Sequence, residues 1–349
     1  MNVFHPPLKN KLYISVANVF ACISVIILHA NGIFWTRPSG RLWITSNFLE
    51  TIFYWPVPIF FMLSGVTLID YRQRYSTKLF LMKRFAKTVI PFLYWSFVAL
   101  FFTAYIYQQP INYNPIQIVD NIFNTRYLSI YWFFIPLFSV YASIPILSMV
   151  TNKIRVYIYA VILGIFFVFV IPFICTILHI SMNTAIIPPV ISGYIVYVLL
   201  GYILDNVQIN HRSRIIIYIL GFIGWLLHFV GTLILSRGKA DINGTFKGYL
   251  NFPCLFQSVA VFVFIKYIDY KKVLGLLYER FSIIIYNLSS LTFGVYLTHF
   301  YLILWIPLYF NIDERCLEWR IIGALFIFTT CSLVTYILHK IPLLNHLVP

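Results

Sequence analysis

Apolar residues come in long runs along this chain, and the polar residues are concentrated in the stretches between the runs. The first run, Leu12–Trp35, contains no Lys, Arg, Asp or Glu. As a helix it is long enough to cross a hydrocarbon core of about 30 Å. Runs of spanning length fall at residues 12–36, 48–70, 86–107, 129–150, 155–178, 187–205, 213–236, 248–268, 283–308 and 319–341. The pattern predicts an all-α fold, a polytopic membrane helix bundle with about ten transmembrane helices.

The composition agrees with a membrane protein. Of the 349 residues, 61% are hydrophobic and 10% are charged, whereas a soluble domain has roughly 25% charged residues. The chain has no internal repeat and no separate polar region, so residues 1–349 are expected to form a single integral membrane domain. The five cysteines lie mostly in apolar runs and lack Cys-x-x-Cys spacing. This arrangement argues against a disulfide framework and against a metal site.

The net charge of +15 is best explained by membrane orientation. If the N-terminus is cytoplasmic and the helices alternate, most of the 25 Lys and Arg residues lie on the inner side. The outer side then carries a minority, namely Arg37, Arg41, Arg126, Arg237, Lys239, Lys247, Arg315 and Arg320. We therefore expect a multi-pass protein of the plasma or inner membrane with both termini cytoplasmic, and no nucleic-acid partner. Glu50 and Asp70, at opposite ends of the second run, are expected to mark its interfaces with water.

The helix predicted for the first run has one polar face, made of Ser15, Asn18, Cys22 and His29. Eleven residues bring a helix back to within about 20° of the same face, which places Asn18 below His29. Lipid does not tolerate such a face, so we expect it to point into the protein or into a wet cavity. A histidine in this position could be a hydrogen-bond partner of a neighbouring helix or a functional group. Intramembrane ionisable residues favour the functional alternative.

The second run and the loop after it carry a recognisable pair of motifs. The run ends in F-F-x-x-S-G, and a short basic loop leads to K-R-x-x-K-x-x-x-P. The motif positions are Phe60, Phe61, Ser64, Gly65, Lys83, Arg84, Lys87 and Pro91. This combination resembles the acyltransferase 3 family of integral membrane O-acyltransferases, whose members also carry a histidine near the outer end of the first helix, matched here by His29.

Two later segments extend the resemblance. The run YWFFIPLFSVYASIPIL is similar to the tryptophan-led helix of the family and contains Trp132. The segment SSLTFGVYLTH resembles a late segment that ends in a tyrosine–histidine pair, here Tyr296 and His299. Two positions depart from the family pattern. Asn18 stands where members usually have an arginine, and Ile130 stands where many have a histidine.

The resemblance implies transfer of an acyl group, commonly acetyl, from acyl-CoA to a hydroxyl of a cell-surface or exopolysaccharide glycan. On this interpretation His29 is the general base, because an imidazole can accept a proton near neutral pH. His299 would orient the acceptor or stabilise the oxyanion; the alternative is a packing histidine. Helix geometry places His29 about 26 Å and His299 about 24 Å from the inner surface. We therefore expect the two to share a cavity, which Asn18, Trp132 and Tyr296 would also line.

Coenzyme A is anionic, so the basic loop after the second run is the expected docking site for its phosphates. The candidates are Arg72, Arg74, Lys83, Arg84 and Lys87. Membrane orientation alone would account for at least half of these charges. Arg84 is favoured because the family motif falls on it. No metal cofactor is expected.

A second class of function is also compatible with the sequence, a non-catalytic translocator or export partner for a lipid-linked saccharide. Asn18, in place of the family arginine, keeps this alternative open. A transporter is expected to show two matching halves with interrupted helices, and the prolines of this chain do not fall in matching halves. The sequence therefore favours the enzyme.

Overall fold

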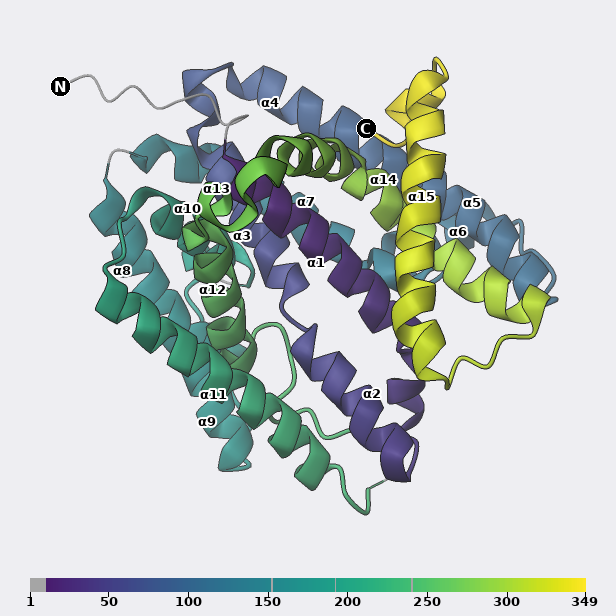
Figure 1. The fold of residues 1–349 in the computed structure, drawn as a ribbon, viewed down its shortest axis with the longest axis horizontal. Helices are drawn as coiled ribbons and strands as arrows, with labels where there is room; N and C mark the ends of the chain where they lie inside the picture. Colours follow the sequence, from purple (N-terminus) through teal and green to yellow (C-terminus); the bar gives the residue numbers. More distant parts are fainter. Residues whose placement is uncertain (1–10, 152, 192, 240) are drawn as a thin grey trace. The chain divides into compact units, whose positions relative to one another are not determined.

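The structure, a computed structural model, describes residues 11–151, 153–191, 193–239 and 241–349. In these residues the regular structure is entirely helical (Figure 1). The chain packs into two compact units. The first unit contains the described residues up to Val25, together with Phe34–Asp70 and Val150–Ser290. The second contains Ile26–Ile33, Tyr71–Met149 and Leu291–Pro349.

The predicted helix bundle is confirmed. In the described part of the chain, eight helical segments are long and apolar enough to cross a membrane. They are Leu12–Ala30, Gly40–Gln73, Thr77–Ile106, Ser129–Val150, Ile154–Ile177, His211–Leu235, Tyr270–Phe310 and Trp319–Lys340. The two remaining predicted runs correspond to shorter apolar helices, α10 (Ile195–Asn206) and α12 (Phe252–Tyr267).

The first unit is built from helices that come from three parts of the chain. The helices that lie wholly or partly in it are α1 (Leu12–Ala30), α2 (Gly40–Ile52), α3 (Pro56–Leu68), α8 (Ile154–Gly164), α9 (Ile171–Ile177), α10, α11 (His211–Leu235), α12, α13 (Tyr270–Leu274) and α14 (Tyr278–Phe310). Helices α3 and α10 cross at very short range. A Cβ atom on Gly65 would lie 1.9 Å from the backbone oxygen of Val198, and one on Gly201 would lie 2.1 Å from that of Met62. Only glycine allows this backbone approach.

The second apolar run is not the single helix that its hydropathy predicts. The helix begins earlier than expected, at Gly40, and α2 ends at Ile52 before α3 starts at Pro56. Pro56 and Pro58 lack the N–H donors that would continue the hydrogen bonds of the preceding turn. The prolines therefore break the run into two helices.

Glu50, near the end of α2, does not mark a water interface as expected. Its side chain is 3% exposed, and Oε1 lies 2.6 Å from Nζ of Lys247, whose side chain is 5% exposed. The Lys247 ammonium also lies 3.8 Å from the ring centroid of Tyr54. Burial lowers the pKa of Lys247, and the Glu50 carboxylate opposes this shift. The segment between α11 and α12 is thereby tied to α2 by a buried ion pair.

The second unit contains the remaining helices and the C-terminal part of α14. Those helices are α4 (Thr77–Arg84), α5 (Ile90–Ile106), α6 (Pro115–Phe123), α7 (Phe134–Leu147) and α15 (Ala324–Lys340). A π-helical turn, Phe85–Val89, joins α4 to α5, and a second one, Trp319–Gly323, precedes α15. Phe92 of α5 packs 5.0 Å, between ring centroids, from Phe134 of α7. The phenol of Tyr301 on α14 donates to the backbone oxygen of Trp95, 2.7 Å away.

Candidate active site

The two histidines singled out in the sequence meet in the second unit. His29 lies at the C-terminal end of α1, and His299 lies well inside α14. Nδ1 of His29 is 2.8 Å from Nε2 of His299, and the two rings are nearly parallel, with centroids 5.1 Å apart. The structure thus brings together two side chains that are 270 residues apart in the sequence.

The backbone around His299 determines the direction of this hydrogen bond. Nδ1 of His299 lies 2.8 Å from the carbonyl oxygen of Tyr296 and 3.1 Å from that of Val295. A carbonyl oxygen can only accept, so Nδ1 of His299 carries the proton. In the neutral ring Nε2 is then an acceptor, and Nδ1 of His29 must donate to it. In this tautomer Nε2 of His29 holds a lone pair.

The two histidines differ in their access to the surface. His299 is 0% exposed, whereas His29 is partly exposed. The edge of Phe300 packs against His29, with ring centroids 5.6 Å apart, and the ring of Tyr296 lies 5.7 Å from that of His299. His299 is therefore enclosed, while His29 is the more accessible member of the pair.

The short helix that contains Trp132 is fixed to α14 beside this pair. Ser129–Phe133 forms a 3₁₀ turn that leads into α7. The phenol of Tyr131 donates to the carbonyl oxygen of Leu297 at 2.8 Å, and the phenol of Tyr296 donates to that of Ile130. Tyr296 and Trp132 thus come from elements that are joined to each other next to His299. The backbone of Ile130 makes this contact, at the position where many family members have a histidine.

Asn18 has a structural contact in the first unit. Its side-chain amide donates to the hydroxyl of Ser289 at 3.0 Å and to the carbonyl oxygen of the same residue at 3.1 Å. Asn18 thereby ties α1 to α14 about three turns before the histidine of α1. At this position the chain has a hydrogen-bonding amide in place of a fixed positive charge.

Arg320 was not identified from the sequence, where it counts only as an outer-loop charge. It is 3% exposed and lies in the π turn before α15. Its Nη1 donates to Oδ1 of Asn31 at 3.3 Å, and its Nε donates to the carbonyl oxygen of Cys316. Asn31 follows His29 by two residues, so Arg320 holds the end of α1 that carries the histidine. The only sign of this role in the sequence is the position of Arg320, a charged residue in the first turn of the apolar run 319–341.

The five basic candidates for the phosphates differ in the contacts that their side chains make. Arg74 and Lys83 both contact the ring of Tyr75, at 5.6 and 4.3 Å from its centroid. Arg72 is bound to the end of α7, where its Nε donates to Oγ of Ser148 at 2.7 Å. The guanidinium of Arg84 lies 5.6 Å from the ring centroid of Tyr141 in α7. Lys87 is exposed, in the π turn between α4 and α5.

The described residues contain no group of three or more His, Cys, Asp or Glu side chains that could hold a metal ion. The second unit thus contains both the histidine pair and the exposed cations of the basic segment.

Comparison with known families agrees with the motifs. The family model for the acyltransferase domain Acyl_transf_3 matches residues 11–339. Searches of curated proteins and of solved structures gave no match. The matched region spans both packed units and nearly the whole chain. The chain therefore belongs to the acyltransferase 3 family and is a multi-pass membrane protein.

Proposed function

We propose that this protein is a membrane O-acyltransferase that moves an acyl group, acetyl in the simplest case, from acyl-CoA to a hydroxyl of a cell-surface or exopolysaccharide glycan. The observation that carries the proposal is the contact between His29 and His299. The hydrogen bond leaves a lone pair on the more accessible ring, which is the arrangement that a general base requires.

In the proposed reaction, Nε2 of His29 accepts the proton of the acceptor hydroxyl while the hydroxyl oxygen attacks the thioester carbonyl. The tetrahedral intermediate then collapses, the carbon–sulfur bond breaks, and an ester of the glycan forms. The departing sulfur takes the proton from Nε2 of His29, which regenerates the neutral base. One proton is taken up and one is returned, so the histidine is unchanged after each turnover.

His299 acts in this scheme as a positioning residue. When His29 accepts a proton, its Nδ1–H becomes a stronger donor to Nε2 of His299, 2.8 Å away. The carbonyl oxygens of Tyr296 and Val295 hold the other ring nitrogen in its protonated form. His299 thus fixes the tautomer of His29 and stabilises the charge that forms on it, as the orienting member of a catalytic triad does.

The phosphates of the donor are proposed to bind Arg74 and Lys83 around Tyr75, with Lys87 nearby in sequence. All three cations are exposed, and phosphate oxygens are favourable ligands for exposed guanidinium and ammonium groups. Arg72 takes no part in this proposal, because its guanidinium already anchors the segment to Ser148.

The proposal is tested with purified protein in lipid nanodiscs. Release of free thiol from acetyl-CoA is followed with a crude envelope glycan as acceptor, for wild type, His29→Ala and the control His211→Ala. His211 is an exposed histidine of the first unit. We expect the His29 variant to lose about 10²- to 10⁴-fold in rate, the usual contribution of a general base. Absence of thiol release in wild type would favour a translocator.

A further inference from the structure

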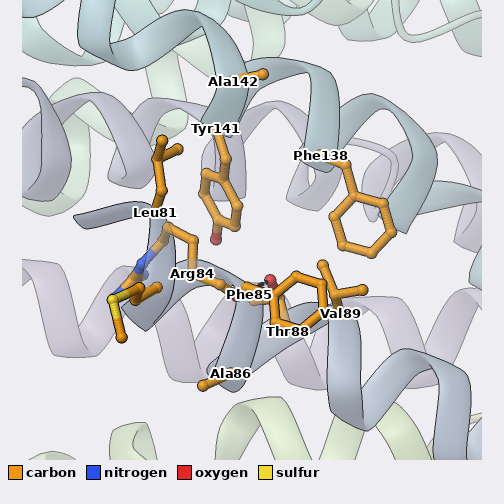
Figure 2. A pocket seen from close by; sticks show the side chains of 10 residues that line it. Leu81, Arg84, Phe85, Ala86, Thr88, Val89, Phe138, Tyr141 and Ala142 are labelled. Carbon is orange, nitrogen blue, oxygen red and sulfur yellow. Dashed lines mark hydrogen bonds between the residues drawn. The ribbon is translucent and has the colours of Figure 1, made fainter. Parts of the chain in front are cut away.

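A pocket of about 580 Å³ lies in the second unit, between the continuous helix α4–α5 and helix α7 (Figure 2). Its volume is within the range typical of small-molecule sites. It is lined by Leu81, Met82, Arg84, Phe85, Ala86, Thr88, Val89, Phe138, Tyr141 and Ala142. The π turn supplies four of these residues, and turns of this kind occur frequently at functional sites.

The lining suits a hydrocarbon. Most of the side chains are aliphatic or aromatic, and the hydroxyl of Thr88 is already bonded to the carbonyl oxygen of Arg84 at 2.5 Å. The polar side chains that remain are Arg84 and Tyr141, which are hydrogen-bonded to each other. The pantetheine arm of coenzyme A carries amide groups, which this lining could not match with hydrogen bonds. An acyl chain needs no such partners.

Arg84 supplies the polar end of the pocket. Figure 2 shows its guanidinium on one side of the pocket and the ring of Phe138 on the other. The Nε atom is buried and has no hydrogen-bond partner among the described residues. Because a buried guanidinium donor is costly when unpaired, the position calls for an acceptor. Phosphate oxygens are the acceptors that a guanidinium matches best.

The side chains around the pocket have the exposure expected of a helix that faces lipid. Leu81 is 45%, Met82 58% and Phe85 56% exposed, within a segment long and apolar enough to span a membrane. Arg84 is the cation of this stretch that lines the pocket. Apolar side chains next to Lys and Arg are typical of sites that take the head group of an anionic lipid.

We propose that this pocket binds an anionic phospholipid, with an acyl chain among the apolar side chains and the phosphate on Arg84. The ligand comes from the leaflet that borders the segment Tyr71–Lys87. This inference is independent of the proposed transferase activity, because the donor phosphates are assigned to the cations around Tyr75. It gives a ligand to Arg84, the basic residue of the motif that lines the pocket.

The proposal is tested by native mass spectrometry of the purified full-length protein in detergent. The probes are dioleoyl phosphatidylglycerol, zwitterionic dioleoyl phosphatidylcholine, inorganic phosphate and acetyl-CoA. Ala142→Trp fills the pocket, and Ser139→Trp, at an exposed position of α7 outside the lining, is the matched control. Arg84→Gln removes the guanidinium, and Lys78→Gln, an exposed cation of α4, is its control.

We expect wild type and both controls to retain phosphatidylglycerol at least about tenfold better than phosphatidylcholine. A difference of this size corresponds to one charge-assisted hydrogen bond that the anionic lipid makes and the zwitterionic lipid does not. Ala142→Trp and Arg84→Gln should both lose the adduct. Thermal unfolding monitors the fold of each variant, and Arg84→Gln decides the question if the tryptophan variant unfolds.

Three results would overturn the proposal. The first is equal retention of the two lipids by wild type. The second is retention of phosphatidylglycerol by folded Arg84→Gln. The third is displacement of the lipid by acetyl-CoA together with loss of acetyl-CoA binding in Ala142→Trp, which would make the pocket part of the donor site.

Discussion

Replacement of His299 tests the hydrogen-bond direction that the backbone imposes on the histidine pair. In His299→Leu, Nδ1 of His29 loses its acceptor at 2.8 Å. In His299→Gln, the side-chain carbonyl oxygen can accept from the same N–H, while the amide can still donate to the backbone. The two variants are similar in size and differ in whether they can stabilise a protonated His29.

The expected size of the effect follows from the bond that is lost. A hydrogen bond to a charged group contributes roughly 1.5–3 kcal/mol, and each 1.36 kcal/mol corresponds to about tenfold in rate. His299→Leu should therefore lower kcat about 10- to 150-fold relative to wild type. His299→Gln should recover most of that loss. The KM for acetyl-CoA should stay the same in both variants, because, among the described residues, His299 hydrogen-bonds to His29, Val295 and Tyr296 and not to the proposed phosphate site.

The assay is thiol release from acetyl-CoA by protein in nanodiscs, with kcat and KM determined separately and folding checked by thermal unfolding. A structural role for His299 would lower the stability of both variants and reduce their kcat equally. Equal kcat in well-folded Leu and Gln variants would refute the acceptor role of His299. A larger loss in the Gln variant than in the Leu variant would refute it as well.

Three further predictions concern other parts of the molecule. Replacing both Arg74 and Lys83 with Gln should raise the KM for acetyl-CoA by about tenfold or more and make the KM less dependent on salt. Initial rates at two ionic strengths measure both effects. An unchanged KM would show that neither residue belongs to the donor site. Glu50→Gln leaves the ammonium of Lys247 without its counter-charge and should cost about 3–5 kcal/mol of stability, whereas the double change with Lys247→Met should cost less. Thermal unfolding of the single and double variants checks this, and equal losses would contradict it. Gly65→Ala places a methyl carbon 1.9 Å from a backbone oxygen of α10. We therefore expect this variant to fail to fold or to unfold at a much lower temperature. A melting curve like that of wild type would show that α3 and α10 can move apart to accommodate the methyl group.

The spanning helices could be predicted from sequence because the bilayer requires long apolar helices whose backbone groups are satisfied internally. The proximity of His29 and His299 could be predicted in part, since two helices that run the same way place both histidines at one level. The direction of their hydrogen bond could not be predicted from the sequence. It depends on the backbone oxygens of Tyr296 and Val295, which no residue pattern reveals.

Interactions between distant segments explain the remaining differences. The ion pair of Glu50 and Lys247 joins residues 197 positions apart. From the sequence pattern, each residue taken alone is predicted to be a charge at a membrane interface. Arg320 is buried because a π turn directs it to Asn31. Charge counting assigns such residues to a side of the membrane, but it contains no information about which partner lies next to them.

The central claim, that His29 is the base of an acyl transfer, is tested most directly by the product. Acetyl-CoA labelled in the acetyl group is incubated with nanodisc-embedded protein and envelope glycan, and alkali-labile label is then measured in the purified glycan. We expect ester-linked label with wild type and at least about a 100-fold loss with folded His29→Ala. Equal labelling by the two proteins, or no labelling by wild type, would contradict it.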